Sequence, residues 1–150
     1  MSHAILTATA PINVTADQAR AWFLSLKEHP ERYTFDTHAG FTVTQGDFGE
    51  VGSRFETEEV FRGFRATLRF ELRDVGAYHF RFRLLAPPLP VWGAFVIAER
   101  AAPPITLRLD VGATNRVGAG LLRLPLLSGA IRRQIQAEVG HIRASMEALF

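Results

Sequence analysis

The chain of 150 residues contains no cysteine, which excludes disulfide bonds, thiolate metal ligands and cysteine nucleophiles. This absence fits a reducing compartment, and we expect a cytoplasmic protein. No apolar run approaches the roughly 20 residues that span a bilayer. The longest apolar segment, Val117–Leu127, is interrupted by Arg123 and Pro125. Residues 1–14 lack a basic region followed by a long apolar core, so we expect no signal peptide.

A strong charge of either sign is also missing. The 17 basic and 15 acidic residues leave a formal net charge of +2, which predicts little electrostatic attraction to nucleic acid. Charged residues make up only 21% of the chain and hydrophobic residues 47%, a balance typical of a folded globule and not of a disordered chain. The length suits a single domain.

The motifs of common enzyme classes are absent as well. The sequence has no GxSxG, no HExxH and no phosphate-binding loop. Asp36 and His38 lie close together in FDTHAGF, but two loop residues do not make a metal site, and the other histidines are scattered. We therefore expect neither a metal ion nor a cofactor.

Helical patterns occur near both ends of the chain. Residues 16–27 carry apolar side chains at helical spacing, and Thr15 with Gln18 forms a capping-box pattern in front of them. Pro30 favours a helix boundary just before it, and a short second helical turn is expected at residues 32–33.

The last 20 residues show the stronger helical pattern. Apolar residues recur there every three or four positions, at Ile131, Ile135, Val139, Ile142, Met146 and Leu149. This spacing predicts one long amphipathic helix with a single apolar stripe, and Ser128 is the expected N-cap.

Strand patterns fill the region between the helices and also precede the first one. The expected strands are 4–12, 41–45, 53–61, 64–73, 77–85, 92–100 and 105–113. Most joints in this region are only two to four residues long, and such joints fit antiparallel hairpins because a parallel crossover needs a dozen residues or more.

Alternation within these strands decides how the segment YHFRFRLL (residues 78–85) is interpreted. Basic residues between aromatics resemble a single-stranded nucleic-acid platform, which needs both kinds of side chain on one surface. In a strand, however, Phe80 and Phe82 face one side and Arg81 and Arg83 the other. We therefore expect a solvated arginine face and no nucleic-acid partner.

The order of the elements, with TATAPINVTADQARAWFLSL (7–26), GEVGSRFETEE (49–59) and the amphipathic last helix, resembles the START-like helix-grip superfamily (SRPBCC), including its polyketide cyclase/dehydrase-like members. The resemblance implies an α+β helix-grip fold: a seven-stranded curved antiparallel sheet wrapped around a long C-terminal helix, with two short helices after the first strand. It also implies one ligand-binding domain over residues 1–150 with an apolar cavity. No catalytic residue follows from it, because this fold hosts many functions.

The inward strand face and the helix stripe supply the expected cavity wall. Its predicted residues are Phe55, Thr57, Glu59, Phe61, Leu68, Phe70, Phe80, Phe82, Trp92, Leu107, Leu109, Ile135 and Val139, with Phe64 on the same face. The alternative is that these phenylalanines simply pack the core.

Glu59 is the one candidate for catalysis, because the phase that buries Phe55 also turns Glu59 inward. A buried carboxyl usually has a partner or a raised pKa, so Glu59 is either a cavity acid/base or a ligand anchor. The alternative is a bulge that lets Glu59 reach water.

The segment before the second strand is expected to border the cavity mouth, where Arg32, Tyr33 and His38 would orient a polar headgroup; the alternative is plain solvated loop residues. Trp92 would line the same mouth. The segment Val117–Leu127, with arginines on both sides, is either an apolar gate that makes transient membrane contact or an ordinary cover of the core.

These features favour a protein that binds or transports a hydrophobic small molecule of lipid, polyketide or isoprenoid type. The alternatives are a polyketide cyclase/dehydratase-type enzyme that uses cavity polar residues, and a co-chaperone-like protein-interaction module. The residue pattern indicates no particular oligomeric state.

Overall fold

The computed structural model describes residues 4–61, 63–98 and 102–150. Its seven strands form one antiparallel sheet in the order β1-β7-β6-β5-β4-β3-β2. The strands are β1 (Ala4–Ile12), β2 (His38–Gln45), β3 (Arg54–Phe61), β4 (Phe64–Val75), β5 (His79–Ala86), β6 (Val91–Ala98) and β7 (Ile105–Ala113). All seven expected strands are present, with ends shifted by up to three residues, and their order confirms the antiparallel hairpins.

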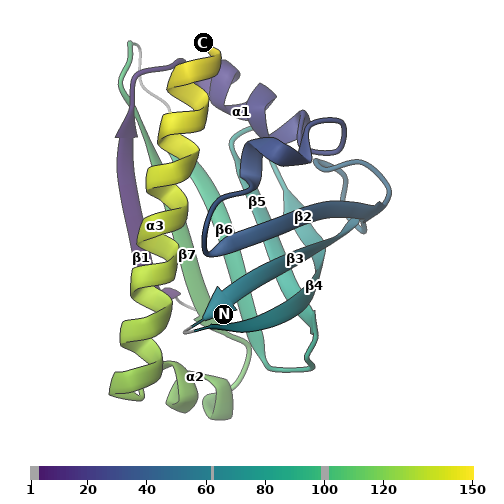
Figure 1. Cartoon of the computed structure of the whole chain (residues 1–150), viewed down its shortest axis with the longest axis vertical. Coiled ribbons are helices and arrows are strands. Elements are labelled where there is room, and N and C mark those ends of the chain that lie inside the picture. Colours follow the sequence, from purple (N-terminus) through teal and green to yellow (C-terminus); the bar gives the residue numbers. More distant parts are fainter. Residues whose placement is uncertain (1–3, 62, 99–101) are drawn as a thin grey trace.

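Four helical segments accompany the sheet: α1 (Ala16–Leu24), the 3-10 helix η1 (Pro30–Tyr33), α2 (Arg116–Leu122) and α3 (Pro125–Leu149). The sheet curves around α3, which runs beside β1 and β7, while α1 covers one end of the sheet and α2 lies at the other (Figure 1). This arrangement is the α+β helix-grip architecture, with its two short helical segments after the first strand. No helix in the described part of the chain is long and apolar enough to cross a membrane.

The first helix begins as the sequence predicts. Thr15 Oγ1 accepts from the backbone N–H of Gln18 at 3.1 Å, and the Gln18 side chain accepts from the backbone N–H of Thr15 at 3.0 Å. The helix ends at Leu24, three residues earlier than expected. Ser25 follows as the C-cap and donates its hydroxyl to the carbonyl oxygen of Trp22 at 2.6 Å.

The last helix is longer than its apolar stripe. It begins at Pro125, whose fixed φ suits the first helical turn, so the expected N-cap at Ser128 is wrong. The Ser128 hydroxyl instead donates to the carbonyl oxygen of Pro125 at 3.2 Å, inside the first turn. The sequence reading also missed α2, which Asn115 caps by accepting from the N–H of Gly118 at 2.9 Å.

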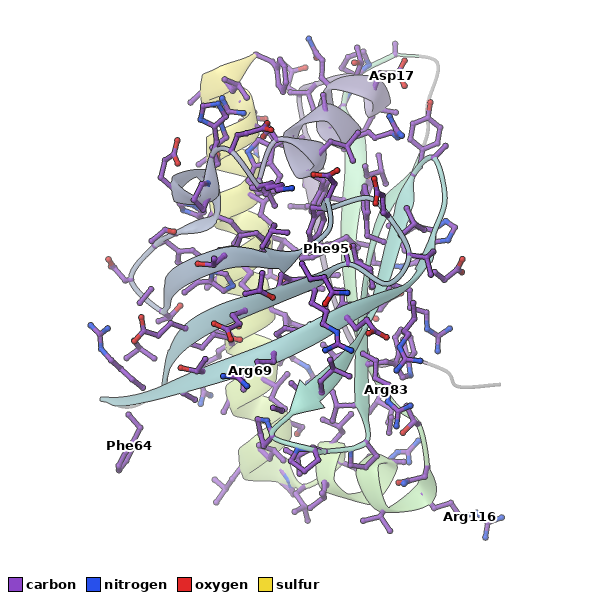
Figure 2. All side chains as sticks on the ribbon, turned by 90° about the vertical axis from the view of Figure 1, so that its right-hand side faces the viewer. Asp17, Phe64, Arg69, Arg83, Phe95 and Arg116 are labelled. Atoms are coloured by element: carbon purple, nitrogen blue, oxygen red, sulfur yellow. The ribbon has the colours of Figure 1, made fainter. Side chains whose placement is uncertain are left out.

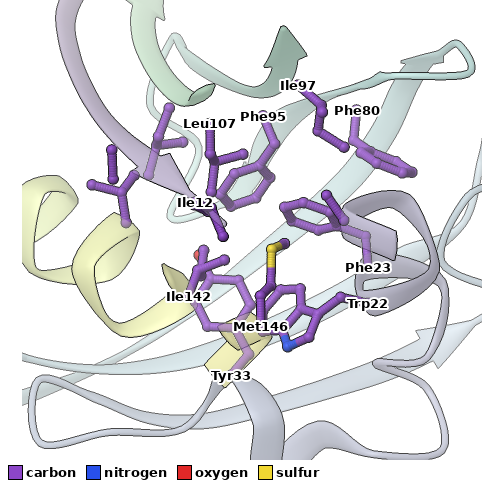
Figure 3. Close-up of a cluster of buried hydrophobic side chains, with 14 of the residues drawn as sticks. Ile12, Trp22, Phe23, Tyr33, Phe80, Phe95, Ile97, Leu107, Ile142 and Met146 are labelled. Carbon is purple, nitrogen blue, oxygen red and sulfur yellow. The ribbon is translucent and has the colours of Figure 1, made fainter. Parts of the chain in front are cut away.

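A compact apolar core fills the end of the molecule under α1 (Figure 3). Phe23 lies 5.0 Å from Phe80 and 4.9 Å from Phe95 between ring centroids. The indole N–H of Trp22 donates to Ser145 Oγ on α3 at 2.9 Å, so the one polar atom of this ring is satisfied. Because side chains fill this end, any free space must lie nearer to α2.

The outer face of the sheet carries the arginines, as the alternation predicts. Arg69 pairs with Glu56 at 2.8 Å across β3 and β4, and Figure 2 shows Arg69 and Arg83 on the outside of the sheet. Arg81 lies over the ring of Trp92, 4.1 Å from the ring centroid, on the same outer side. The arginines and the inward phenylalanines of β5 are therefore on opposite faces.

Candidate ligand cavity

A cavity of about 420 Å³ lies between the sheet and α3. Of the wall residues expected from the sequence, Phe55, Thr57, Glu59, Leu68, Phe70, Phe82, Leu109 and Ile135 line it. Strands β3 to β7 and α3 all contribute lining residues. The alternative in which the phenylalanines leave no free space is wrong, although most of the wall is indeed aromatic or aliphatic.

Other expected wall residues lie elsewhere. Phe80 and Leu107 are fully buried in the core under α1, because β5 and β7 extend beyond the cavity into that cluster. Val139 is also a core residue: it is one turn beyond the lining residue Ile135 on the same face of α3, where the helix packs into the core cluster. The side chain of Phe61 lies outside the described residues.

Two aromatic residues were assigned to the wrong place. Trp92 points to the outer face, because it alternates with the lining residues Val91 and Phe95 on β6, so it lines neither the wall nor the mouth. Phe64 is 79% exposed. It lies at the tip of the β3–β4 hairpin, borders a separate shallow hollow beside α3, and projects away from the molecule in Figure 2.

The cavity has one open end and one closed end. The lining residues that are exposed are Pro87, Leu89, Leu121 and Leu127, so the mouth lies between the β5–β6 loop and the α2–α3 corner. The opposite end contains the buried side chains of Tyr33 and His38. The expectation that these two residues border the mouth is therefore wrong.

Aromatic stacking explains the burial of Tyr33 and His38. The short helix η1 turns the Tyr33 ring inward, where its centroid lies 4.1 Å from His38 and 5.3 Å from Phe41 in stacked pairs. Arg32, the third residue expected at the mouth, lines no part of the cavity. Its carbonyl oxygen accepts from His141 Nε2, 3.2 Å away on α3.

The polar groups of the closed end form a connected network around Glu138. Tyr33 donates its hydroxyl to Glu138 Oε1 at 3.1 Å, and His38 Nε2 lies 3.4 Å from the same oxygen. The other ring nitrogen, His38 Nδ1, is 2.6 Å from the carbonyl oxygen of Tyr33. A carbonyl can only accept, so Nδ1 carries a proton and Nε2 of the neutral ring is an acceptor.

Burial shifts the pKa values of both groups toward their uncharged forms. Desolvation lowers the pKa of His38 to about 4. Desolvation, followed by the nearby charge of Glu59, raises the pKa of Glu138 well above its ordinary value. Both shifts favour a neutral imidazole beside a protonated carboxyl over an ion pair.

Glu59 reaches the cavity from the sheet side. It is buried, and Thr57 donates to its Oε2 at 2.8 Å while Gln134 Nε2 approaches its Oε1 at 3.4 Å. Strands β3 and β4 pair in unbroken register around it, so the alternative of a bulge that exposes Glu59 to water is wrong. Desolvation is the largest influence on its carboxyl and raises its pKa.

Sequence reasoning missed two of these residues, Gln134 and Glu138. Both belong to the apolar stripe of α3: Glu138 is three residues after Ile135 and four before Ile142, and Gln134 is one turn before Glu138. An acid at such a position faces the sheet by helical geometry. That signal was available, because the stripe was defined from its apolar members alone.

Comparisons with known proteins agree on the fold. No protein-family model and no curated protein matches the chain. Among solved structures, the Zhui aromatase/cyclase from Streptomyces sp. R1128 superposes with a TM-score of 0.74 at 12% identity, covering 98% of this chain and 94% of that one. The chain has the helix-grip fold.

Two further helix-grip structures show how widely this architecture is shared. The KanY protein matches with a TM-score of 0.73 at 14% identity over 98% of this chain and 97% of that one. Ara h 8.0201 matches with a TM-score of 0.70 at 9% identity over 99% of both chains. At such low identities the likeness concerns the helix-grip fold, and the chemistry has to be argued from the cavity.

Proposed function

We propose that this helix-grip protein binds a hydrophobic small molecule of lipid, polyketide or isoprenoid type in the cavity between the sheet and α3. The observation that carries the proposal is the cavity itself, about 420 Å³ in volume, with a largely apolar wall and an open mouth. Ligand pockets commonly measure about 300–1,000 Å³. Protein interiors are otherwise packed with few voids, so a space of this size is best explained by an occupant.

The residues at the rim of the mouth suit the entry of a hydrophobic ligand from a membrane surface. Exposed apolar side chains gather there, at Leu89, Val117, Leu121, Leu124, Leu126 and Leu127. The sequence from residue 111 to 137 contains four arginines and no acidic residue. We infer that this rim makes transient contact with an anionic membrane surface, because apolar insertion and arginine–lipid attraction act there together.

Dye displacement tests the binding proposal. An environment-sensitive hydrophobic dye should bind with one-to-one stoichiometry and be displaced by lipids or polycyclic aromatics. Trp22 and Trp92 both lie outside the cavity, so Phe70→Trp places a reporter in the wall and its emission should change on binding. Phe64→Trp, on the same strand but outside this cavity, is the matched control and should not respond. A broad panel without saturable binding would refute the proposal and leave the protein-interaction alternative.

An enzyme of the cyclase or dehydratase type is the second candidate, and the network at the closed end favours it. Burial in the cavity raises the pKa of Glu138, which is the shift that lets a carboxyl act as a general acid near neutral pH. Glu59 is a second carboxyl of the same cavity. An aromatase/cyclase shares the fold, which is compatible with such chemistry without establishing it.

A further inference from the structure

The closed end of the cavity is electrostatically one-sided. Two carboxyl groups, Glu59 and Glu138, belong to its wall, and none of the described lining residues is a lysine or an arginine. A ligand that ends in a carboxylate would therefore meet two acids and no counter-charge there. In an apolar site such an arrangement is strongly unfavourable, because water cannot compensate for the missing partner.

The hydrogen-bond donors of the closed end are already used inside the protein. Tyr33 donates to Glu138, and Thr57 donates to Glu59. The two N–H bonds of the Gln134 amide are directed to the carbonyl oxygen of Thr37 at 3.1 Å and to Glu59 at 3.4 Å. His38 Nδ1 is held by the carbonyl of Tyr33. Apart from a carboxyl that carries its own proton, no described polar side chain of the wall keeps a free donor for a ligand.

One acceptor, in contrast, is left over. Both polar contacts of Glu138 involve Oε1, and Oε2 accepts no hydrogen bond from the part of the chain that the structure describes. The residue is only 7% exposed and lines the cavity. Oε2 carries a lone pair in either protonation state of the carboxyl. It is not fully enclosed by protein atoms, so a donor inside the cavity can reach it.

We propose that this end of the cavity selects apolar ligands whose buried terminus is a hydrogen-bond donor, a hydroxyl or a protonated amine, and rejects ligands that end in a carboxylate. The inference rests on the proposed binding function and names its ligand class. The ligand's donor group hydrogen-bonds to Glu138 Oε2. The apolar body of the ligand lies along the apolar wall and extends toward the mouth of the cavity. An amine gains in addition from the two carboxyls, since its charge stabilises their ionised forms.

A head-group series with one common chain tests the selection. Decylamine, decanol, methyl decanoate and decanoate, each below its micelle concentration at pH 7.5, would displace the dye from the Phe70→Trp protein. The amine and the alcohol should act at concentrations about tenfold lower than decanoate, because only they satisfy the buried acceptor. Methyl decanoate, uncharged but without a donor, should be weaker than the alcohol.

Glu138→Gln supplies the decisive comparison, because the amide keeps the shape, removes the ionisable group and adds N–H donors. The advantage of decylamine over decanoate should shrink about tenfold in this variant. The advantage of decylamine over decanoate should persist in the control Glu56→Gln, which removes an outward-facing carboxylate of the same sheet. If Glu138→Gln does not fold, Glu59→Gln serves instead, and the advantage of the amine should shrink there too.

The outcomes separate this inference from the proposed function. Saturable binding in which decanoate equals or exceeds the amine and the alcohol would overturn the selection and leave the binding function intact. A preference that survives both cavity variants unchanged would also overturn it, because it would then arise elsewhere. Failure of every compound and of the dye to bind would instead refute the binding function itself.

Discussion

Nε2 of His38 lies 3.4 Å from Oε1 of Glu138, while Nδ1 of the same ring is 2.6 Å from the carbonyl oxygen of Tyr33. The backbone carbonyl thus fixes the histidine tautomer and leaves Nε2, the nitrogen near Glu138, as an acceptor. Burial shifts the pKa values of both side chains, in opposite directions. Their protonation states should therefore be visible in the stability of the protein.

The first prediction concerns the pH dependence that His38 contributes. Its pKa falls from 6.5 to about 4 on folding, so the unfolded chain binds more protons between these values and stability is lost as pH falls through this window. From pH 7 to pH 5 the loss should be about 2 kcal/mol. Denaturant unfolding of the native protein and of His38→Gln at both pH values gives the change in the free energy of unfolding for each protein. The contribution of His38 is the difference between these two changes.

The native protein has to be compared with His38→Gln because the buried carboxyl groups change the free energy of unfolding with pH in the opposite direction to His38. Burial raises the pKa of both Glu59 and Glu138, so their contribution is complete below about pH 4.5 and is lost as pH rises toward their folded-state pKa. These two residues are present in both proteins. An equal loss of stability in His38→Gln would contradict the assignment of a neutral His38.

The second prediction tests the role of α3 in holding the sheet. Ile142 is fully buried on the helix stripe, so Ile142→Ala should lower the free energy of unfolding by about 2–5 kcal/mol. Gln136→Ala, on the exposed side of the same helix, should stay within about 0.5 kcal/mol of the native value. Equal effects in the two variants would show that α3 does not pack as described.

The third prediction separates a carrier from an enzyme at Glu59. Glu59→Gln keeps the hydrogen bond with Thr57 within reach and removes the ionisable group. An enzyme that uses this carboxyl as its acid or base should lose turnover by about 100-fold or more while its ligand affinity is kept. A carrier that uses it as an anchor should lose affinity instead. Titration calorimetry and product analysis on one preparation distinguish these results, and no change in either would remove Glu59 from both roles.

The fourth prediction concerns the exposed apolar side chains at the rim of the cavity mouth. Leu126 is 82% exposed and does not line the cavity, so Leu126→Asp should weaken co-sedimentation with vesicles that contain phosphatidylglycerol without changing ligand affinity. Val51→Asp is a matched control, because Val51 is also exposed but lies far along the chain from the rim. Binding should weaken as salt rises. Association of Leu126→Asp with vesicles as strong as that of the native protein would refute the membrane contact.

The fifth prediction follows from the outer arginine face. Arg81 and Arg83 lie opposite the inward Phe80 and Phe82, so stacking and phosphate contacts cannot combine on one surface. We expect no salt-sensitive binding of single-stranded oligonucleotides at micromolar protein concentration near physiological salt. Measurable binding that disappears in the double variant Arg81→Ala/Arg83→Ala would prove this wrong.

The sequence by itself determined the strands, the first helix, the apolar stripe of the last helix and the two faces of the sheet. Strand alternation and helix periodicity are local properties, since they depend on which residues lie two, three or four positions apart. For that reason the capping box of Thr15, the outward arginines of β5 and the inward carboxyl of Glu59 were all predictable. The hairpin pairing of strands β3 to β7 followed as well, because short joints favour neighbouring antiparallel partners, whereas the pairing of β1 with β7 joins distant segments.

Tertiary structure alone decided where core ends and cavity begins. Phe80 and Phe82 have the same sequence signature, yet α1 covers the first and leaves the second facing free space. The closed end is likewise non-local: Tyr33 and Glu138 are 105 residues apart and share one hydrogen bond. Local spacing in the sequence does not predict this contact. The contact depends on how η1 and α3 pack against the same curved sheet, and the packing of the whole interior sets their positions.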